Sequence, residues 1–268
     1  MSSYLFDNRI EPSSERLSRL ERVCDAATVR CLDTLGIATG WHCLEIGAGG
    51  GSIANWVSQR VGSEGSVIVT DIEPRFIESL ADAKRNVVVR RRHDIVVDEL
   101  PESAFDLIHA RHVFVHIADA PALLPKLKAA LKPGGWLVIE DFDPIIDRTV
   151  LIPDRVKAAA LHRVAQGIWK LFAKRGGTGV NWGRQLPAHF RQLGMANVGV
   201  DVNYHCATAG SDFAQFHKIT FAQTRAEGVA EGLASEQDYD TAIALMDDPA
   251  TLYYSNPVFT AWGQRPTS

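Results

Sequence analysis

The sequence predicts an α/β fold, in which a mostly parallel sheet carries helices on both faces. Short apolar runs alternate with longer amphipathic segments from residue 41 onward. Runs such as 67–69 and 136–139 are apolar throughout, which is typical of strands that are covered on both sides. With 268 residues, 46% of them hydrophobic and 22% charged, the chain can bury such a core without disulfides or metal.

The first half of the chain supplies the expected parallel strands. Apolar residues recur at three- and four-residue steps over 13–37, which indicates a helical cap within residues 1–38. After this cap, strands and helices alternate at the spacing of a parallel sheet. Strands are expected at 41–46, 67–70, 87–89, 105–109 and 136–140, and helices at 52–61, 74–83 and 121–131.

The alternation breaks after Asp143. A long helix is expected at 153–175, where Gly176 and Gly177 end it, and residues 145–182 are interpreted as a helical lid inserted after the fifth strand. The glycines of 176–179 are the expected hinge of this lid. Further helices are expected at 184–193, 211–227 and 235–247, and strands at 197–206 and 257–263. No linker divides the chain, so residues 1–268 are expected to form one domain.

Glycines cluster directly after the first strand. Four of the 21 glycines fall in the run Gly47-Ala48-Gly49-Gly50-Gly51, and a helix follows. Such glycines are needed for positive φ or for close approach of a ligand, and ligands bind at this end of parallel strands. No Gly-Lys-Ser/Thr ends the loop, and Ser52 occupies the third glycine position of the dinucleotide fingerprint. Asp71, at the tip of the second strand, is placed to accept hydrogen bonds from ribose hydroxyls, so an adenosine-bearing cofactor is expected.

Residues 40–142 resemble the class I S-adenosylmethionine (SAM)-dependent methyltransferases. Five segments carry the resemblance in the right order, namely Cys43–Gly51, Val69–Ile72, Arg92–Ile95, Phe105–Arg111 and Leu131–Leu137. The resemblance implies SAM as cofactor, with S-adenosylhomocysteine (SAH) as product. It also implies a Rossmann-like, doubly wound sheet of seven strands, mostly parallel with an antiparallel last strand. The strands expected at 197–206 and 257–263 fit that ending.

The resemblance also assigns cofactor-binding roles. Glycines of the loop would let the ribose and the amino-acid part lie against the backbone, Asp71 would bind the ribose hydroxyls, and Asp94 would accept from the adenine amine. Glu45 would order the loop. The full set of implied cofactor residues is Glu45, Gly47, Ala48, Gly49, Gly51, Asp71, Ile72, His93, Asp94, Ile95, Ala110 and Arg111.

The methyl-transfer step needs no metal, although an imidazole suits removal of a proton from a phenol or enol. His109, His112 and His116 cluster after the fourth strand, and packing near the cofactor is favoured over metal binding there. Spacing leaves the general base open among His116, His162, His205 and Asp141. The aromatic residues Trp169, Phe172 and Trp182 in the lid favour an apolar acceptor.

The net charge and the composition exclude several classes of binding partner. The net charge of -4 argues against nucleic acid, and the basic run of Arg85 and Arg90–Arg92 is interpreted as a solvated edge. No apolar run approaches the ~20 residues of a membrane span, and four cysteines without a CxxC pair suit a reducing cytoplasm. The expected function is methylation of a small, largely apolar molecule, such as a secondary metabolite or quinone-like ring. An RNA or protein methyltransferase, a nicotinamide oxidoreductase and a non-catalytic SAM-binding regulator are the alternatives, and homodimerisation is left open.

Overall fold

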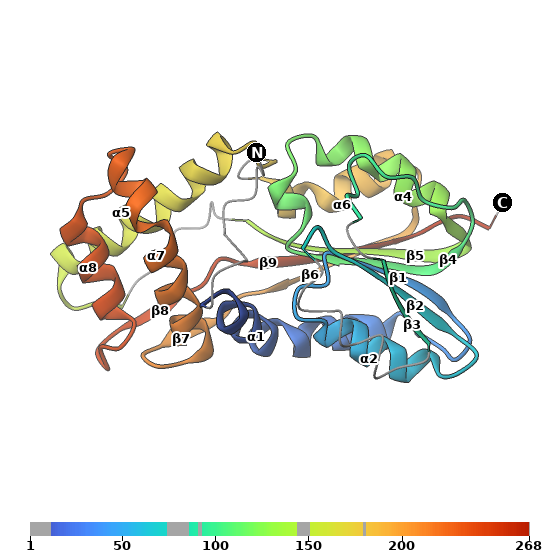
Figure 1. Ribbon diagram of the computed structural model, residues 1–268, viewed down its shortest axis with the longest axis horizontal. Helices are drawn as coiled ribbons and strands as arrows, with labels where there is room; N and C mark the ends of the chain where they lie inside the picture. The colour runs from blue at the N-terminus through green and yellow to red at the C-terminus, as the bar shows by residue number, and fades with distance from the viewer. Residues whose placement is uncertain (1–11, 74–85, 91–92, 144–150, 179–180, 268) are drawn as a thin grey trace.

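A seven-stranded sheet runs through the centre of the protein (Figure 1). The structure, a computed structural model, describes residues 12–73, 86–90, 93–143, 151–178 and 181–267. The strand order is β3-β2-β1-β4-β5-β9-β6. The strands are β1 (His42–Ile46), β2 (Ser66–Thr70), β3 (Val87–Arg90), β4 (Phe105–Arg111), β5 (Leu131–Phe142), β6 (Ala196–Asn203) and β9 (Val258–Gln264).

The first five strands are parallel, and β9 is antiparallel to both of its neighbours, β5 and β6. The antiparallel last strand predicted from the sequence is therefore present. This arrangement brings the carboxyl ends of β1, β2 and β4 to one edge of the sheet, where the loops after them meet.

Helices cover both faces of the sheet because successive strand residues point to opposite sides. On one face, Cys43 and Val67 pack with α1 (Pro12–Thr34) and α2 (Ser52–Val61). On the other face, Leu44 and Ile108 pack with α4 (Leu124–Ala130) and α6 (Trp182–Gln192). Figure 1 shows the two helical layers below and above the sheet. The apolar character of β1, β2, β4 and β5 thus has its explanation in two separate cores.

A third helical layer lies beyond the carboxyl edge of the sheet (Figure 1, left). It consists of α5 (Arg155–Lys174), α7 (Asp212–Ala230) and α8 (Glu236–Leu245), with a small sheet of β7 (Cys206–Thr208) and β8 (Leu252–Tyr254). This helical layer has its own hydrophobic cluster, which includes Leu161, Val164, Phe221 and Tyr239. α7 also packs against α1, where Arg19 and Arg22 bind Asp212 at 2.7 and 3.0 Å.

The observed elements differ from the predicted ones in five places. The lid predicted at 145–182 is only part of the helical layer, because α7 and α8 come from residues far along the chain. The strand predicted at 197–206 is divided between β6 and β7, and β8 was not predicted. The helix predicted at 121–131 begins as a 3-10 turn at Ala120–Leu123 and continues as α4. A further 3-10 turn at Phe114–His116 follows β4.

The helix predicted at 74–83 lies outside the described residues, as do Arg85, Arg91 and Arg92 of the basic run. Within the described ranges, no helix is both long and apolar enough to cross a bilayer.

Candidate active site

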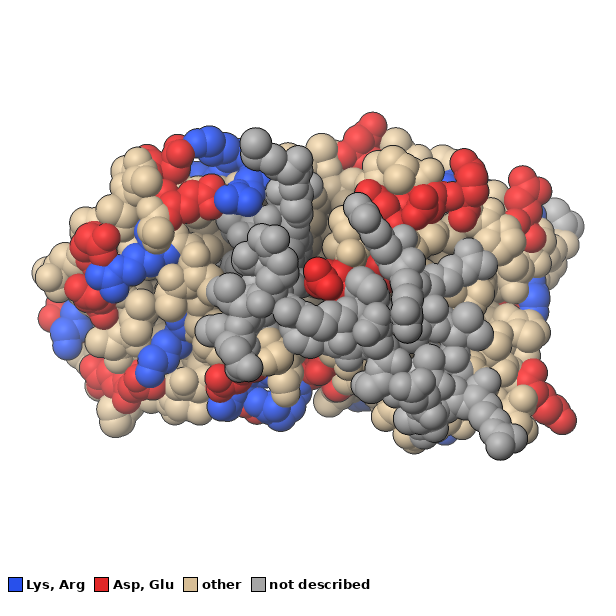
Figure 2. Space-filling view, in the orientation of Figure 1, with Lys and Arg blue, Asp and Glu red and all other residues tan. Residues whose placement is uncertain are grey.

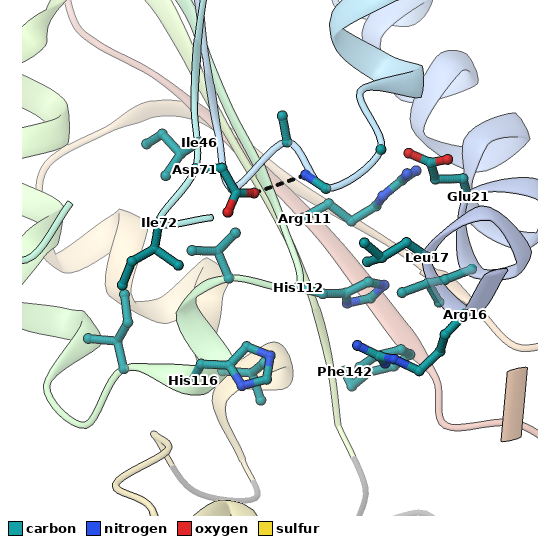
Figure 3. Close-up of a pocket in the computed structure, with 18 of the residues that line it drawn as sticks. Arg16, Leu17, Glu21, Ile46, Asp71, Ile72, Arg111, His112, His116 and Phe142 are labelled. Atoms are coloured by element: carbon teal, nitrogen blue, oxygen red, sulfur yellow. Dashed lines mark hydrogen bonds between the residues drawn. The ribbon is translucent and has the colours of Figure 1, made fainter. Parts of the chain in front are cut away.

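A cavity of about 430 Å³ lies at the carboxyl edge of the sheet, between the strand ends and the helical layer. Its walls come from the glycine loop, the ends of β2 and β4, segment 93–96, and helices α1, α5 and α7. Figure 3 shows Asp71 and Ile72 on one side of this cavity and Arg16 and Leu17 of α1 on the other. Segments that are distant in sequence therefore enclose one space.

The glycine loop has the backbone that only glycine adopts easily. Gly47, Gly49 and Gly51 have φ angles of 65°, 59° and 86°. At Gly47 a Cβ atom would lie 2.3 Å from Cγ2 of Val113, so the loop packs tightly on the segment after β4. The N–H groups of Gly47 and Ala48 donate to the Thr70 carbonyl, which ties the loop to β2. Gly51 precedes α2 and lies outside the cavity lining.

Asp71 connects the second strand to the loop. One carboxylate oxygen accepts from the N–H of Gly49 at 3.1 Å, the dashed line in Figure 3, and the other accepts from the N–H of Glu73 at 2.8 Å. Burial raises the pKa of Asp71, and these two N–H groups oppose that shift. The neighbouring Ile72 is 56% exposed although it is large and apolar, and it lines the cavity. A carboxylate and an apolar platform therefore stand side by side, which suits a ribose and a flat base.

Segment 93–96 forms the next part of the wall. Asp94 accepts from the N–H of Val96 at 2.9 Å, and its own N–H donates to Asp98 at 2.8 Å. Both ring nitrogens of His93 are buried without a hydrogen-bond partner among the described residues. Buried polar atoms are normally satisfied, so these nitrogens point to a polar group that a ligand would bring.

A buried ionic network lies beneath the loop. His109 Nδ1 lies 2.7 Å from Glu45, and its Nε2 lies 2.9 Å from Glu140; all three side chains are at most 6% exposed. Burial alone would lower the pKa of His109, but the two carboxylates raise it to about 9. Burial disfavours the charged Glu140, yet the bond from His109 brings its pKa down to about 2. Thr28 and Thr260 also donate to Glu140, at 2.6 and 2.7 Å, so α1 and β9 join the network.

Helix α1 closes the cavity from the side. Its Arg16, Leu17, Leu20 and Glu21 line the cavity, and none of them was predicted as a site residue. Leu17 and Leu20 belong to the apolar repeat seen in the sequence, but that repeat alone does not distinguish a core face from a cavity wall. Arg111 at the end of β4 donates to Thr28 and Asp25 of α1, at 3.0 and 2.9 Å.

Aromatic rings line the part of the cavity next to the helical layer. They are Phe142, Trp169, Phe172, Phe216 and Phe221. Trp169 and Phe172 stack with 5.1 Å between their centroids, as expected for two of the predicted lid residues. Trp182 is instead buried in the core, where its indole N–H donates to Asp141 at 2.8 Å.

The structure separates the predicted catalytic residues. His116 lines the cavity, and burial with the nearby Arg16 lowers its pKa to about 3. His162 is exposed on α5 and His205 lies near Phe213, so neither lines the cavity. Asp141 is fully buried behind the wall, and burial raises its pKa to about 8.

Most of the residues predicted to bind the cofactor line the cavity; the exceptions are Gly51 and Ala110. Ala110 is buried inside β4. Of the three clustered histidines, His109 faces the two glutamates while the other two lie in the cavity wall. Among the described residues, no group of three or more His, Cys, Asp and Glu is placed to hold a metal ion.

Comparison with known proteins agrees with this geometry. A family model described as a methyltransferase domain matches residues 16–182. The chain belongs to this family. The family is that of the class I SAM-dependent methyltransferases, which the sequence resembles.

Curated relatives match parts of the sequence of this chain. A ubiquinone/menaquinone biosynthesis C-methyltransferase UbiE of Idiomarina loihiensis is 28% identical over 124 residues, which cover 44% of this chain and 49% of that protein. Methyltransferase str3 of Strobilurus tenacellus is 28% identical over 100 residues, covering 37% of this chain and 35% of that protein. The chain thus spans about half the length of these relatives or less.

Solved structures share the fold. A phosphoethanolamine N-methyltransferase 2 of Haemonchus contortus, solved with SAM, aligns with a TM-score of 0.59 at 17% identity, over 99% of this chain and 60% of that one. A putative methyltransferase of Bacillus halodurans aligns with a TM-score of 0.59 at 11% identity, over 89% of this chain and 98% of that one.

The cavity residues fit the SAM that the family implies. The Gly47 site has no room for a side chain, the exposed Ile72 offers a surface for an adenine, and the His93 nitrogens lack partners.

Proposed function

We propose that this methyltransferase acts on a small, largely apolar molecule, such as a secondary metabolite or a quinone-like ring. One observation carries the proposal: a single cavity extends from the glycine loop and Asp71 to the aromatic rings of α5 and α7. A cofactor and a flat apolar acceptor can therefore lie in one space. The relatives named as quinone-biosynthesis methyltransferases support an acceptor of this kind.

Each residue of the cofactor part of the cavity has a proposed role in binding SAM. Asp71 binds the ribose hydroxyls, Ile72 packs on the adenine, and Asp94 accepts from its amine. Gly47 and Gly49 allow the cofactor close to the backbone, Arg111 lies at the methionine end, and Glu45 orders the glycine loop. When bound, SAM supplies a methyl group activated on a sulfonium. The protein contributes by holding the two reactants in line and excluding water from between them.

The helical layer supports a small acceptor over RNA or protein. α5 and α7 supply aromatic side chains to the cavity, and α1 packs against α7 at its side. On the face shown in Figure 2, the described basic residues are interspersed with acidic ones and do not gather into one basic surface. A macromolecular acceptor would need an open groove of matching charge. The aromatic part of the cavity also favours an enzyme over a non-catalytic SAM-binding regulator.

Calorimetry with SAM, SAH and NADH tests the cofactor, and SAH release in the presence of aromatic alcohols, quinols, RNA or peptides tests the acceptor class. We expect binding of SAM and SAH, no binding of NADH, and SAH release with small aromatic molecules. Absence of SAM binding would refute the proposed function, and turnover only with RNA or peptide would refute the acceptor class.

A further inference from the structure

His112 has an unusual backbone in the cavity wall. It directly follows β4 and has a φ of 56°, the left-handed region that non-glycine residues rarely adopt. Its N–H donates to the Glu140 carbonyl at 2.8 Å, and its ring stacks on Phe142 with 3.9 Å between centroids and 6° between planes. Strained residues held this firmly cluster at functional sites. Figure 3 shows the His112 ring next to Phe142 and Arg16 in the cavity wall.

Two unsatisfied atoms face each other behind this ring. His112 Nδ1 and Asp141 Oδ1 are 3.9 Å apart, and both are buried without a hydrogen-bond partner in the part of the chain that the structure describes. The other carboxylate oxygen of Asp141 is held by the Trp182 indole at 2.8 Å. A movement of about 1 Å would join the imidazole and the carboxylate by a hydrogen bond. The pair therefore has the parts of a histidine base supported by a carboxylate.

We propose that His112, supported by Asp141, takes the proton from the methyl acceptor, and that the acceptor nucleophile is a hydroxyl on an aromatic or enolic ring. This inference rests on the proposed function. The acceptor O–H bond breaks and its proton moves to His112 Nε2. The oxygen lone pair bonds to the methyl carbon, while the methyl–sulfur bond breaks with its electron pair going to sulfur. The imidazolium is stabilised by Asp141 and then releases its proton to water.

The surroundings of His112 favour the neutral imidazole that this step requires. Burial, then Arg111, and also His116 and Arg16 lower the pKa of His112 well below 6.5, while Glu140 opposes them. A neutral ring can accept a proton, and Asp141 is the carboxylate placed to stabilise the product. His116 differs from His112 in its contacts, because its ring packs on Phe172 with 4.9 Å between centroids, whereas the His112 ring stacks on Phe142 and faces Asp141.

Cys24 of α1 is the remaining group at this ring. Its Sγ lies 3.7 Å from His112 Nε2, so cysteine, histidine and aspartate stand in a row. Burial raises the pKa of Cys24 to about 12, and the side chain does not line the cavity. The thiol therefore stays protonated and is not a nucleophile here. The proposed step requires the His112 ring, which lines the cavity, to exchange this weak contact for a bond from the acceptor hydroxyl, a stronger donor than a thiol.

The proposal has a pH signature. Protonated Asp141 has no charge with which to stabilise the His112 imidazolium, and burial raises the pKa of Asp141 to about 8. Glu140 adds to this rise, and the N–H groups of Trp182, Val115 and Phe114 oppose it. Turnover should therefore rise with pH through about 8. Replacing Asp141 by Asn should lower turnover and remove this rise.

The test uses 4-nitrophenol, whose phenolate is yellow, as a probe in two measurements. In the first, the probe binds to SAH-loaded enzyme and absorbance gives the fraction that is ionised. In the second, the probe and SAM are supplied together and the release of SAH gives the turnover. His112→Asn is the main variant because Asn tolerates a positive φ. Asp141→Asn is the second variant. His42→Asn is the matched control, since His42 is exposed at the start of β1.

We expect the wild type and His42→Asn to bind the probe and to raise its phenolate fraction over that in free solution. We expect His112→Asn to lose this increase and about 10²–10⁴-fold in turnover, with SAH affinity within about threefold of wild type. Asp141→Asn should lose the pH rise. Wild-type turnover or an unchanged pH profile in these variants would overturn the inference, as would failure of SAH-loaded wild type to bind the probe. Failure of wild type to bind SAH would instead refute the proposed function itself.

Discussion

At the scale of single residues, His109 matters most for the stability of the fold, because it is the positively charged member of a buried network. No sequence motif predicts this network. His109 joins Glu45 of β1 to Glu140 of β5, and Glu140 in turn receives bonds from Thr28 and Thr260. Five elements, α1, β1, β4, β5 and β9, therefore meet at one charged network. Removing one member of such a network leaves its partners buried and uncompensated.

The network predicts a pH dependence of stability. The pKa of His109 is raised from 6.5 to about 9, so its contribution is complete below about pH 6.5 and is lost as pH rises through about 9. The difference amounts to about 3 kcal/mol at most, at about 1.4 kcal/mol per pH unit. Urea unfolding between pH ~6 and ~10 should show this decrease in wild type and in His42→Gln. His109→Gln should be less stable at neutral pH and lack the decrease, and an identical pH dependence would contradict the assigned charge.

Asp71 predicts an effect on cofactor binding. Its carboxylate is the buried group proposed to accept the ribose hydroxyls, so Asp71→Ala should weaken SAH binding by about 1–3 kcal/mol, measured by calorimetry. Asp33→Ala is the control, because Asp33 is half exposed and binds Arg60 on the surface. Equal SAH affinity in the two variants would refute the role of Asp71.

At the scale of elements, the glycine loop depends on its neighbours as much as on its own backbone. Gly47 and Gly36 both have positive φ, but their surroundings differ. A Cβ atom added at Gly47 would meet Val113, whereas one added at Gly36 would meet nothing within 4 Å. Gly36→Ala should cost about 1–2 kcal/mol for the backbone alone. Gly47→Ala should cost about 1–3 kcal/mol more because of the clash, and should also weaken SAH binding. Chemical denaturation and calorimetry measure both effects, and equal losses of stability would show that the close contact is unimportant.

At the scale of the whole molecule, the helical layer has a core of its own, and the proposed cofactor half of the cavity is built from other elements. Leu161→Ala in that core should cost about 2–5 kcal/mol of unfolding free energy. SAH affinity, measured well below the unfolding temperature, should stay within about twofold of wild type. Loss of SAH binding by a variant that is still folded would show that the helical layer also supports the cofactor.

Local patterns account for what was predicted correctly. The strands of the parallel sheet are apolar on both faces, and the glycine run needs backbone freedom that few residues have, so both were readable from the sequence. Cofactor binding by the twelve predicted residues stays a prediction. Ten of them line the cavity, because they follow strands whose carboxyl ends must meet. Gly51 and Ala110 do not line it, because neighbouring residues in a turn or strand face different ways.

Local sequence patterns could not predict which residues form the acceptor side of the cavity. His162 and His116 look alike in sequence, yet one is exposed on α5 and the other lines the cavity. Asp141 looked like a candidate base at a strand end, but the strand turns it away from the cavity and toward Trp182 and His112. The contribution of α7 depends on long-range packing against α1 and α5, which leaves no local signal.

The linear order of residues thus determined the parallel sheet, the glycine loop and the resemblance to the methyltransferase family, because short-range backbone and patterning requirements are carried by neighbouring residues. The folded chain established which histidine lies beside a carboxylate, which helix closes the cavity, and which charges are buried together. Those relations join residues separated by tens to hundreds of positions, such as Thr28 with Glu140 or Arg19 with Asp212. They arise from packing across the sheet edge, and only three-dimensional contact specifies them.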